Sequence, residues 1–198
     1  MPKAGVLVVV ACTFLGGSAL AQDIAQSAPG EGSRVDTGTS RKMDGGATFL
    51  LMPLGRGNGQ DDLALAYGVG VSLGYTVFHG LSLGLAPQVL FNIKRAEDPR
   101  KQYDLMARIV YTYRATTRIS VYGEVLPGYS IISPRKGDSA TGFVVAAGAG
   151  GAVDLTDRLF ANVSVGYQYG LQALQIEGTK YFERDTFLRI AVGGGVRF

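Results

Sequence analysis

The chain has 198 residues, a formal net charge of +3, 29 glycines, no tryptophan and a single cysteine. This length suits one domain. No basic stripe is interleaved with aromatic residues, which argues against a nucleic-acid-binding protein. After the opening segment, no stretch approaches the roughly 20 consecutive apolar residues of a membrane helix, so the apolar residues are spread out along the chain.

The N-terminus has the pattern of a secretory signal peptide. Lys3 supplies the positive start, an apolar stretch follows, and Ala19 and Ala21 form an A-x-A cleavage site. We therefore predict that residues 1–21 are a signal peptide that is removed from the mature protein.

The single cysteine, Cys12, lies inside this segment, so the mature chain is predicted to contain no disulfide. Val9 to Cys12 resembles a lipoprotein processing box, although the apolar run before it is short. Lipidation of Cys12 therefore stays open as an alternative.

Residues 22–44 are rich in Ser, Gly, Asp, Gln and Thr. They contain too few apolar residues to fold alone, and we predict a flexible, disordered periplasmic leader. The folded domain is predicted to span residues 45–198.

From residue 45 onward, apolar side chains alternate with small or polar ones. In one segment Tyr67, Val69 and Val71 share one parity, and Gly68 and Gly70 share the other. This period of two indicates strands with one apolar face. We predict eight strands, at residues 45–54, 63–78, 81–94, 102–114, 118–132, 141–155, 158–171 and 186–198.

The connections alternate in length. Tight turns follow the second, fourth and sixth predicted strands, and longer polar segments follow the others, at residues 55–62, 95–101, 134–140 and 173–185. Transmembrane barrels have short periplasmic turns and longer extracellular loops, with an even number of strands. The chain is thus predicted to be all-β, an eight-stranded antiparallel up-and-down transmembrane barrel. A soluble secreted barrel is the alternative, but it would not carry Val, Leu and Tyr on its outward face.

Aromatic residues on the outward parity cluster near both ends of the predicted strands, as in the aromatic girdles of membrane proteins. They are Tyr75, Tyr111, Tyr113 and Phe198 at one end, and Phe91, Tyr103, Tyr129, Tyr167 and Tyr169 at the other. Pro87 and Pro127 fall inside predicted strands, where we expect a bulge or a local break because proline cannot donate to the ladder.

The last strand alternates apolar residues with small or cationic ones and ends on an aromatic, Phe198. With the eight-strand pattern, residues 45–198 resemble the small OmpA/OmpX-type outer-membrane barrels of Gram-negative bacteria. The resemblance implies a monomer in the outer membrane, surrounded by lipid and lipopolysaccharide. It also implies insertion by the barrel assembly machinery, which reads Phe198 as a signal.

The inward parity carries a charged set. If the turn at residues 115–117 pairs Arg114 with Arg118, the same register pairs Arg108 with Glu124. Two further charges, Asp104 and Arg189, also face inward. An eight-stranded barrel is only wide enough for side chains to fill. These four residues are therefore predicted to form ion pairs that close the lumen, and a gate or ion path is the alternative.

No catalytic, cofactor or metal site is predicted. His79, the only histidine, lies in a tight turn without a nearby nucleophile or orienting acid. These patterns favour a non-enzymatic structural or interaction protein of the cell envelope that acts through its extracellular loops. The alternatives are a narrow pore or conduit for small or hydrophobic molecules, and a lipid A-modifying enzyme, against which the position of His79 argues.

Overall fold

The computed structural model describes residues 42–57, 62–63, 65–91, 101–133, 140–176 and 179–198. The predicted signal peptide, its cleavage site at Ala19 and Ala21, Cys12 and nearly all of the predicted leader lie outside the described residues. The described part contains strands and turns. Within it, no helix is long and apolar enough to cross a membrane.

Every strand pairing in the described part is antiparallel. The strands are β1 (Met43–Gly57), β2 (Asp62–Leu63), β3 (Ala66–Phe78), β4 (Leu81–Leu85), β5 (Gln88–Phe91), β6 (Lys101–Arg114), β7 (Ile119–Ser133), β8 (Ala140–Asp154), β9 (Leu159–Ile176) and β10 (Thr179–Arg197).

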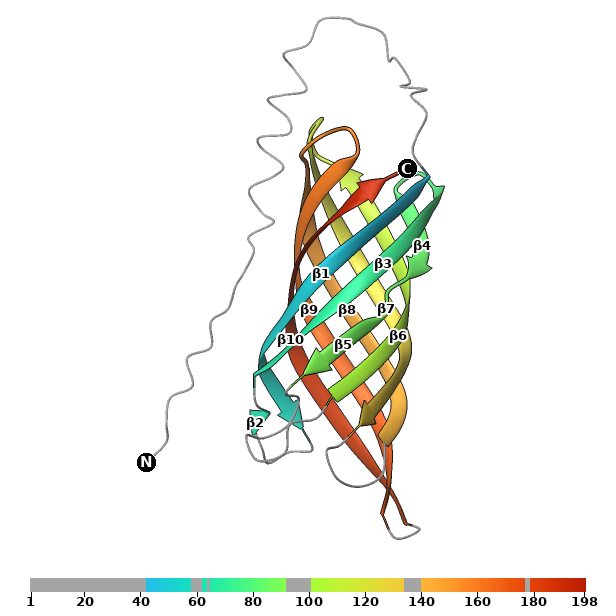
Figure 1. The fold of residues 1–198 in the computed structure, drawn as a ribbon, viewed down its shortest axis with the longest axis vertical. Helices are drawn as coiled ribbons and strands as arrows, with labels where there is room; N and C mark the ends of the chain where they lie inside the picture. Colours follow the sequence, from blue (N-terminus) through green and yellow to red (C-terminus); the bar gives the residue numbers. More distant parts are fainter. Residues whose placement is uncertain (1–41, 58–61, 64, 92–100, 134–139, 177–178) are drawn as a thin grey trace, which may run out of the picture. The chain divides into compact units, whose positions relative to one another are not determined.

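The strands close into a ring (Figure 1). From β5 to β10 each strand pairs with the next, and β1 pairs with both β3 and β10, which joins the two ends of the sheet. Both β4 and β5 pair with β3 on one side and β6 on the other, so they occupy one position. The two-residue β2 pairs only with the end of β1. The described part is therefore a closed antiparallel barrel with eight strand positions, as predicted.

One predicted loop is a strand hairpin instead. Residues 173–185 were expected to form an extracellular loop, but β9 and β10 pair residue by residue up to Ile176 and Thr179. The prediction was wrong because it interpreted polar residues as a loop. A backbone ladder satisfies its own N–H and C=O groups whatever the polarity of the side chains.

The first strand also begins earlier than predicted. Met43 and Asp44, assigned to the leader, pair with Tyr75 and Gly74 of β3. Asp44 also pairs with Arg197 of β10, so it lies at the seam where the barrel closes.

The prolines interrupt the sheet in different ways. At Pro87 the predicted third strand is divided into β4 and β5, as expected. At Pro127 no break occurs: β7 stays continuous and pairs with Val145 of β8, while its pairing to β6 skips from Gly128 to Val125 without a change of register. A third proline, Pro53, coincides with a register shift between β1 and β10 that the sequence analysis did not anticipate.

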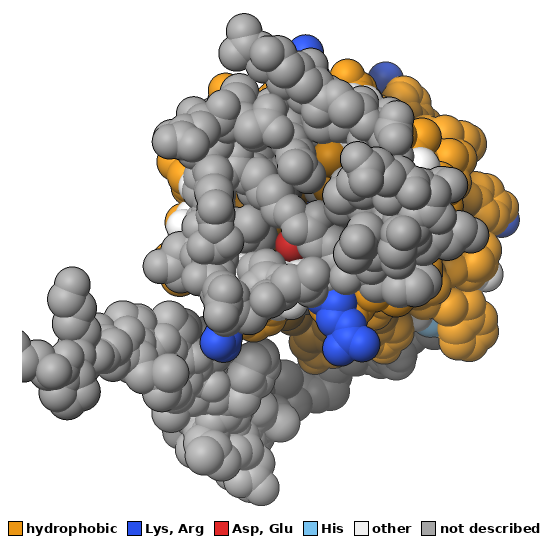
Figure 2. Space-filling model, turned by 90° about the horizontal axis from the view of Figure 1, so that it is seen from below, with side chains coloured by type: hydrophobic (Ala, Val, Ile, Leu, Met, Phe, Trp, Pro, Cys, Tyr) orange, Lys and Arg blue, Asp and Glu red, His pale blue; other side chains and the backbone are white. Residues whose placement is uncertain are grey.

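The outer face is apolar, as the alternation predicts. Exposed hydrophobic side chains cover the flank of the barrel, as seen from the end that carries β2 (Figure 2). The aromatic residues assigned to the outward parity are exposed, among them Tyr111, Tyr113, Tyr167 and Phe198, except Phe91, which is half-buried.

The inner face holds two apolar clusters. One contains Leu50, Met52, Ala66, Leu90, Phe187 and Ala191. The other contains Met106, Leu126, Val144 and Ala146, with Ala86 packed against it. The side chains of the inward parity thus fill the barrel rather than lining an open channel, as expected for eight strands.

Candidate functional site: the lumen and a groove in the barrel wall

Two ion pairs cross the lumen. The Arg189 Nη1 atom lies 2.9 Å from Glu124 Oε1, and both side chains are about nine-tenths buried. The Arg108 Nη1 atom lies 2.9 Å from Asp44 Oδ2. The hydroxyl of Ser164 donates a hydrogen bond of 2.9 Å to the same oxygen of Glu124. Three of the four predicted lumen residues, Arg108, Glu124 and Arg189, thus take part in ion pairs. The fourth, Asp104, does not take part in either pair.

The predicted pairing of Arg108 with Glu124 is wrong. Glu124 lies opposite Val110, two residues along β6 from the expected partner. The turn is longer than expected because Arg118 belongs to it: the Thr116 hydroxyl accepts hydrogen bonds from the N–H groups of Arg118 and Ile119. A register error of two residues keeps every side chain on its face but changes its partner.

Asp104 lies in a cage of amides rather than beside a cation. Its carboxylate accepts hydrogen bonds from the side-chain amides of Gln88 at 2.7 Å, Gln102 at 2.7 Å and Gln168 at 3.1 Å. The Gln88 amide also donates to Gln168 Oε1 at 3.0 Å. Asp104 is 3% exposed, so these donors replace the water that the carboxylate has lost.

A further cluster of charged residues, Asp154, Arg197 and Arg114, lies at the end of the barrel that carries the short turns. Asp154 binds Arg197 at 2.6 Å through one oxygen and Arg114 at 3.1 Å through the other. The guanidinium of Arg197 also lies 4.9 Å from the centre of the Phe160 ring. This geometry is that of a cation–π contact.

The acidic partners in two of these groups, Asp44 and Asp154, were not predicted from the sequence. Asp44 was missed because it was assigned to the leader. Asp154 lies on the inward parity of β8, so its position in the alternation could have identified it. The amide cage around Asp104 joins β5, β6 and β9, and its residues meet only when the barrel closes.

Described residues of these groups enclose a small cavity. A cavity of about 50 Å³ lies between the central ion pairs, lined by Arg108, Tyr122, Glu124 and Arg189 among others. Such a volume holds a few water molecules. Among the described residues, no group of three His, Cys, Asp or Glu side chains is arranged to hold a metal ion.

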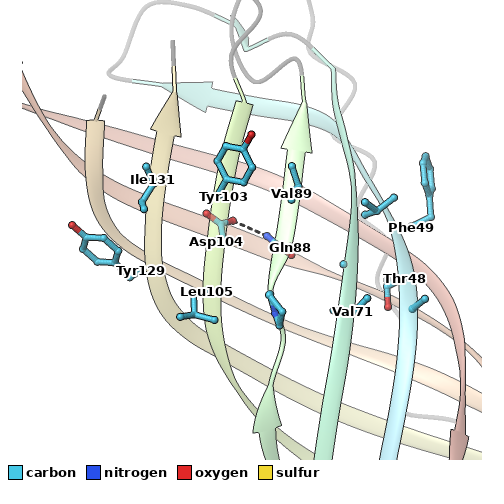
Figure 3. Close-up of a pocket in the computed structure, with 14 residues that line it drawn as sticks. Thr48, Phe49, Val71, Gln88, Val89, Tyr103, Asp104, Leu105, Tyr129 and Ile131 are labelled. Atoms are coloured by element: carbon cyan, nitrogen blue, oxygen red, sulfur yellow. Dashed lines mark hydrogen bonds between the residues drawn. The ribbon is translucent and has the colours of Figure 1, made fainter. Parts of the chain in front are cut away.

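A larger cavity lies in the wall of the barrel. It is an open groove of about 790 Å³ across β1, β3, β5, β6 and β7 (Figure 3). Its lining is mostly apolar and outward-facing: Ala47, Phe49, Val69, Val71, Pro87, Val89, Tyr103, Leu105, Tyr129 and Ile131, together with Thr48, Gly70, Gln88 and Asp104.

The groove lies at the break between β4 and β5. The N–H group of Val71 donates to the carbonyl of Pro87 at 3.0 Å, but the proline nitrogen cannot return a bond. On the other side, the N–H group of Ala86 donates to Met106 at 2.8 Å. The wall is thin here, because Gly70, Pro87 and Gln88 line both this groove and the small cavity of the lumen.

A family model described as "Outer membrane protein beta-barrel domain" matches residues 8–198. The chain belongs to this outer-membrane β-barrel family. Its place is therefore the outer membrane of a bacterium, and the exposed apolar residues of the barrel face lipid. No curated protein matches the chain.

Solved structures show the same fold. Neisserial surface protein A is 17% identical, with a TM-score of 0.59 over 79% of this chain and 97% of that one. The outer membrane protein OprG from Pseudomonas aeruginosa is 12% identical, with a TM-score of 0.50 over 79% of this chain and 94% of that one. At these identities the similarity establishes the barrel fold alone.

The remaining predicted residues lie at the short-turn end of this barrel. Phe198 is 67% exposed, and its N–H group donates to the carbonyl of Met43 at 2.9 Å, which ties the C-terminus to the start of β1. His79 lies in the turn after β3, next to Gly80, whose φ of 77° suits glycine. The ring of His79 packs edge-on against Phe78 at 4.7 Å.

Proposed function

We propose that this outer-membrane barrel is a structural or interaction protein with a closed, non-conducting lumen. The Arg189–Glu124 pair carries the proposal, because it joins β10 to β7 across the interior with both charges buried. Apolar clusters and the Asp104 amide cage fill much of the interior beside it. The variable part of the function then belongs to the end of the barrel with the longer connections.

Conductance across a planar lipid bilayer tests this proposal. We expect the purified full-length protein to produce no discrete ion current, because the buried Arg189–Glu124 pair and the two apolar clusters occupy the interior. A stable single-channel current that changes in Glu124→Ala, but not in the outward variant Val165→Ala, would overturn it.

A narrow conduit for small or hydrophobic molecules is the second candidate function. The observation that favours it is the thin wall at Gly70 and Pro87, where the groove and the lumen cavity share lining residues. Uptake of a hydrophobic dye by cells that produce the protein would support the conduit. Equal uptake with and without the protein favours the closed barrel.

The proposal also assigns no catalytic role to the barrel. Its single histidine lies in a short turn and packs against Phe78 rather than beside an acid–nucleophile pair. We expect the mass spectrum of lipid A to be the same after deletion and after overproduction of the protein. A new or missing lipid A species would contradict this assignment.

The proposed partners are outer-membrane lipid and lipopolysaccharide around the wall, and the barrel assembly machinery at Phe198. A monomer is proposed, with no nucleic acid or cofactor. Native mass spectrometry from detergent tests the oligomeric state. A dimer that persists on dilution would contradict the proposed monomer.

A further inference from the structure

The groove in the barrel wall opens on the surface that faces lipid. Its rim residues Phe49, Leu105 and Tyr129 are each at least half exposed and belong to the same outward parity as the rest of the apolar flank. The groove is therefore continuous with the membrane-facing surface of this family member. The material available to fill it is the hydrocarbon of the surrounding bilayer.

Side-chain size explains the shape of the groove. One row of outward residues, matched in register across the wall, is Phe49, Val69, Val89, Tyr103 and Ile131. The adjacent row contains Ala47, Val71, Pro87, Leu105 and Tyr129. In this second row the short side chains of Ala47, Val71 and Pro87 lie over β1, β3 and the break between β4 and β5. The longer side chains of Leu105 and Tyr129 lie over β6 and β7. Phe49 and Tyr129 stand on opposite sides of Val71 in Figure 3.

The polar groups near the floor are already satisfied. Asp104 and Gln88 are 3% and 5% exposed, and they bind each other and Gln168. The bottom of the groove therefore offers no charge that would recognise a polar headgroup. The volume of about 790 Å³ lies within the range of roughly 300–1,000 Å³ that is typical of ligand sites, most of which are lined by apolar side chains.

We propose that this groove holds an acyl chain of a membrane lipid, lying across the strands between Phe49 and Tyr129. An acyl chain covers the short residues Val71 and Pro87 and fills the depression left by the break between β4 and β5. Its headgroup stays outside the groove at the membrane surface. This inference concerns the outer wall and does not depend on whether the lumen conducts.

Photo-crosslinking in a bilayer tests the proposal. The full-length protein is reconstituted into phosphatidylethanolamine vesicles that contain a phospholipid with a diazirine in the middle of one acyl chain. Illumination and mass spectrometry of peptides then locate the label. We expect several-fold more label at Val71 and Leu105 than at Val163 and Val165, which are similarly exposed outward residues of β9 that do not line the groove.

A pair of matched variants separates site binding from general lipid contact. Val71→Phe fills the floor of the groove, and Val165→Phe adds the same bulk elsewhere; the two valines are 57% and 52% exposed. The excess label is expected to disappear in the first variant and to persist in the second. Ala47→Leu is a second filling variant, and heat-modifiable gel mobility checks that each variant is folded.

Three results would overturn the proposal. One is even labelling around the barrel. The second is an excess that persists in both filling variants. The third is a protein–protein crosslink through the groove without a lipid adduct, which would assign the groove to a second copy of the chain or to another protein.

Discussion

The buried acids Glu124 and Asp104 are satisfied in different ways, one by an ion pair and the other by hydrogen bonds. Glu124 and Arg189 face each other with both side chains about nine-tenths buried. Asp104, which has no cation in its amide cage, is instead surrounded by three hydrogen-bond donors. Burying a charge is costly unless it is paired or hydrogen-bonded. Removing one member of a pair should therefore cost more than removing an exposed charge.

Glu124→Ala tests this cost. Since Arg189 would be left buried without its partner, we expect the free energy of unfolding to fall by about 3–5 kcal/mol. Urea titration of the reconstituted barrel, followed by gel mobility, measures it. Arg114→Ala is the control, because the Arg114 side chain is 65% exposed and its pair with Asp154 contributes little. The double variant Glu124→Met/Arg189→Met should recover much of the loss. Equal losses in Glu124→Ala and the control would show that leaving Arg189 buried without a partner has no special cost.

Gly74 makes room for the second ion pair. A Cβ atom at Gly74 would collide with Asp44 Oδ1 and with the guanidinium of Arg108, whereas a Cβ at Gly123 would meet nothing closer than 4.0 Å. We expect Gly74→Ala to lower the free energy of unfolding by about 1–3 kcal/mol through overpacking. Gly123→Ala should leave it unchanged or slightly raised. The same titration compares them, and a similar effect of both substitutions would show that space at Gly74 is not limiting.

At the residue scale, parity was predictable and partners were not. The alternation of β6 and β10 correctly assigned Asp104, Arg108 and Arg189 to the interior. Partner identity depends on register, and register depends on the length of a turn, where a hydroxyl of Thr116 decides which residues are included. The same arrangement recurs at Thr156, whose hydroxyl accepts from the N–H groups of Arg158 and Leu159. This repeated turn is the signal that would have corrected the register.

At the scale of elements, the nitrogen of Pro87 lacks a hydrogen, and the strand position that contains it is divided into β4 and β5. Pro87 accepts a hydrogen bond from Val71 without returning one, and β4 ends two residues before it. The sequence predicted this break because proline lacks a ladder donor. It did not predict that β7 would run through Pro127 unbroken, since continuous pairing with β8 supports the strand there.

Pro87→Ala should strengthen this part of the wall. The new N–H group can donate to the carbonyl of Val71 and complete the pair, so we expect slower amide hydrogen exchange at Val71 and Ala86 than in the wild type. Exchange in β9 should be unaffected, which makes that strand the internal control. Unchanged exchange at Val71 would mean that features other than the missing donor keep β4 and β5 apart.

At the scale of the whole molecule, the barrel is predicted to be a detergent-resistant unit in the outer membrane. Closure into a ring leaves few unpaired strand edges, and the exposed apolar flank suits lipid or detergent. Protein from outer-membrane fractions should migrate differently on SDS gels before and after boiling. If the protein is recovered in a soluble fraction and its gel mobility does not change on boiling, the assignment of the apolar side chains to the outer face of the barrel is contradicted.

Phe198 allows a test of the proposed insertion signal. Phe198→Ala is expected to reduce the amount of heat-modifiable protein in the outer membrane, yet to fold normally when purified protein is diluted into detergent. Tyr113→Ala is the matched control, because Tyr113 is an outward aromatic of similar exposure (63% against 67%) at the same end of the barrel. A defect in the purified variant would point to stability rather than to recognition.

The seam between β1 and β10 has a kinetic consequence. Asp44 pairs with Arg197, so the ladder that completes the ring joins opposite ends of the barrel sequence. Contacts between residues so far apart in the sequence slow folding. The intervening chain loses conformational entropy when its ends are brought together, and the stabilising contacts form only afterwards. Until β10 pairs with β1 and β9, each of these two strands has an unpaired edge that can pair with another molecule. We therefore expect the chain to be most prone to aggregate in the interval before the ring closes.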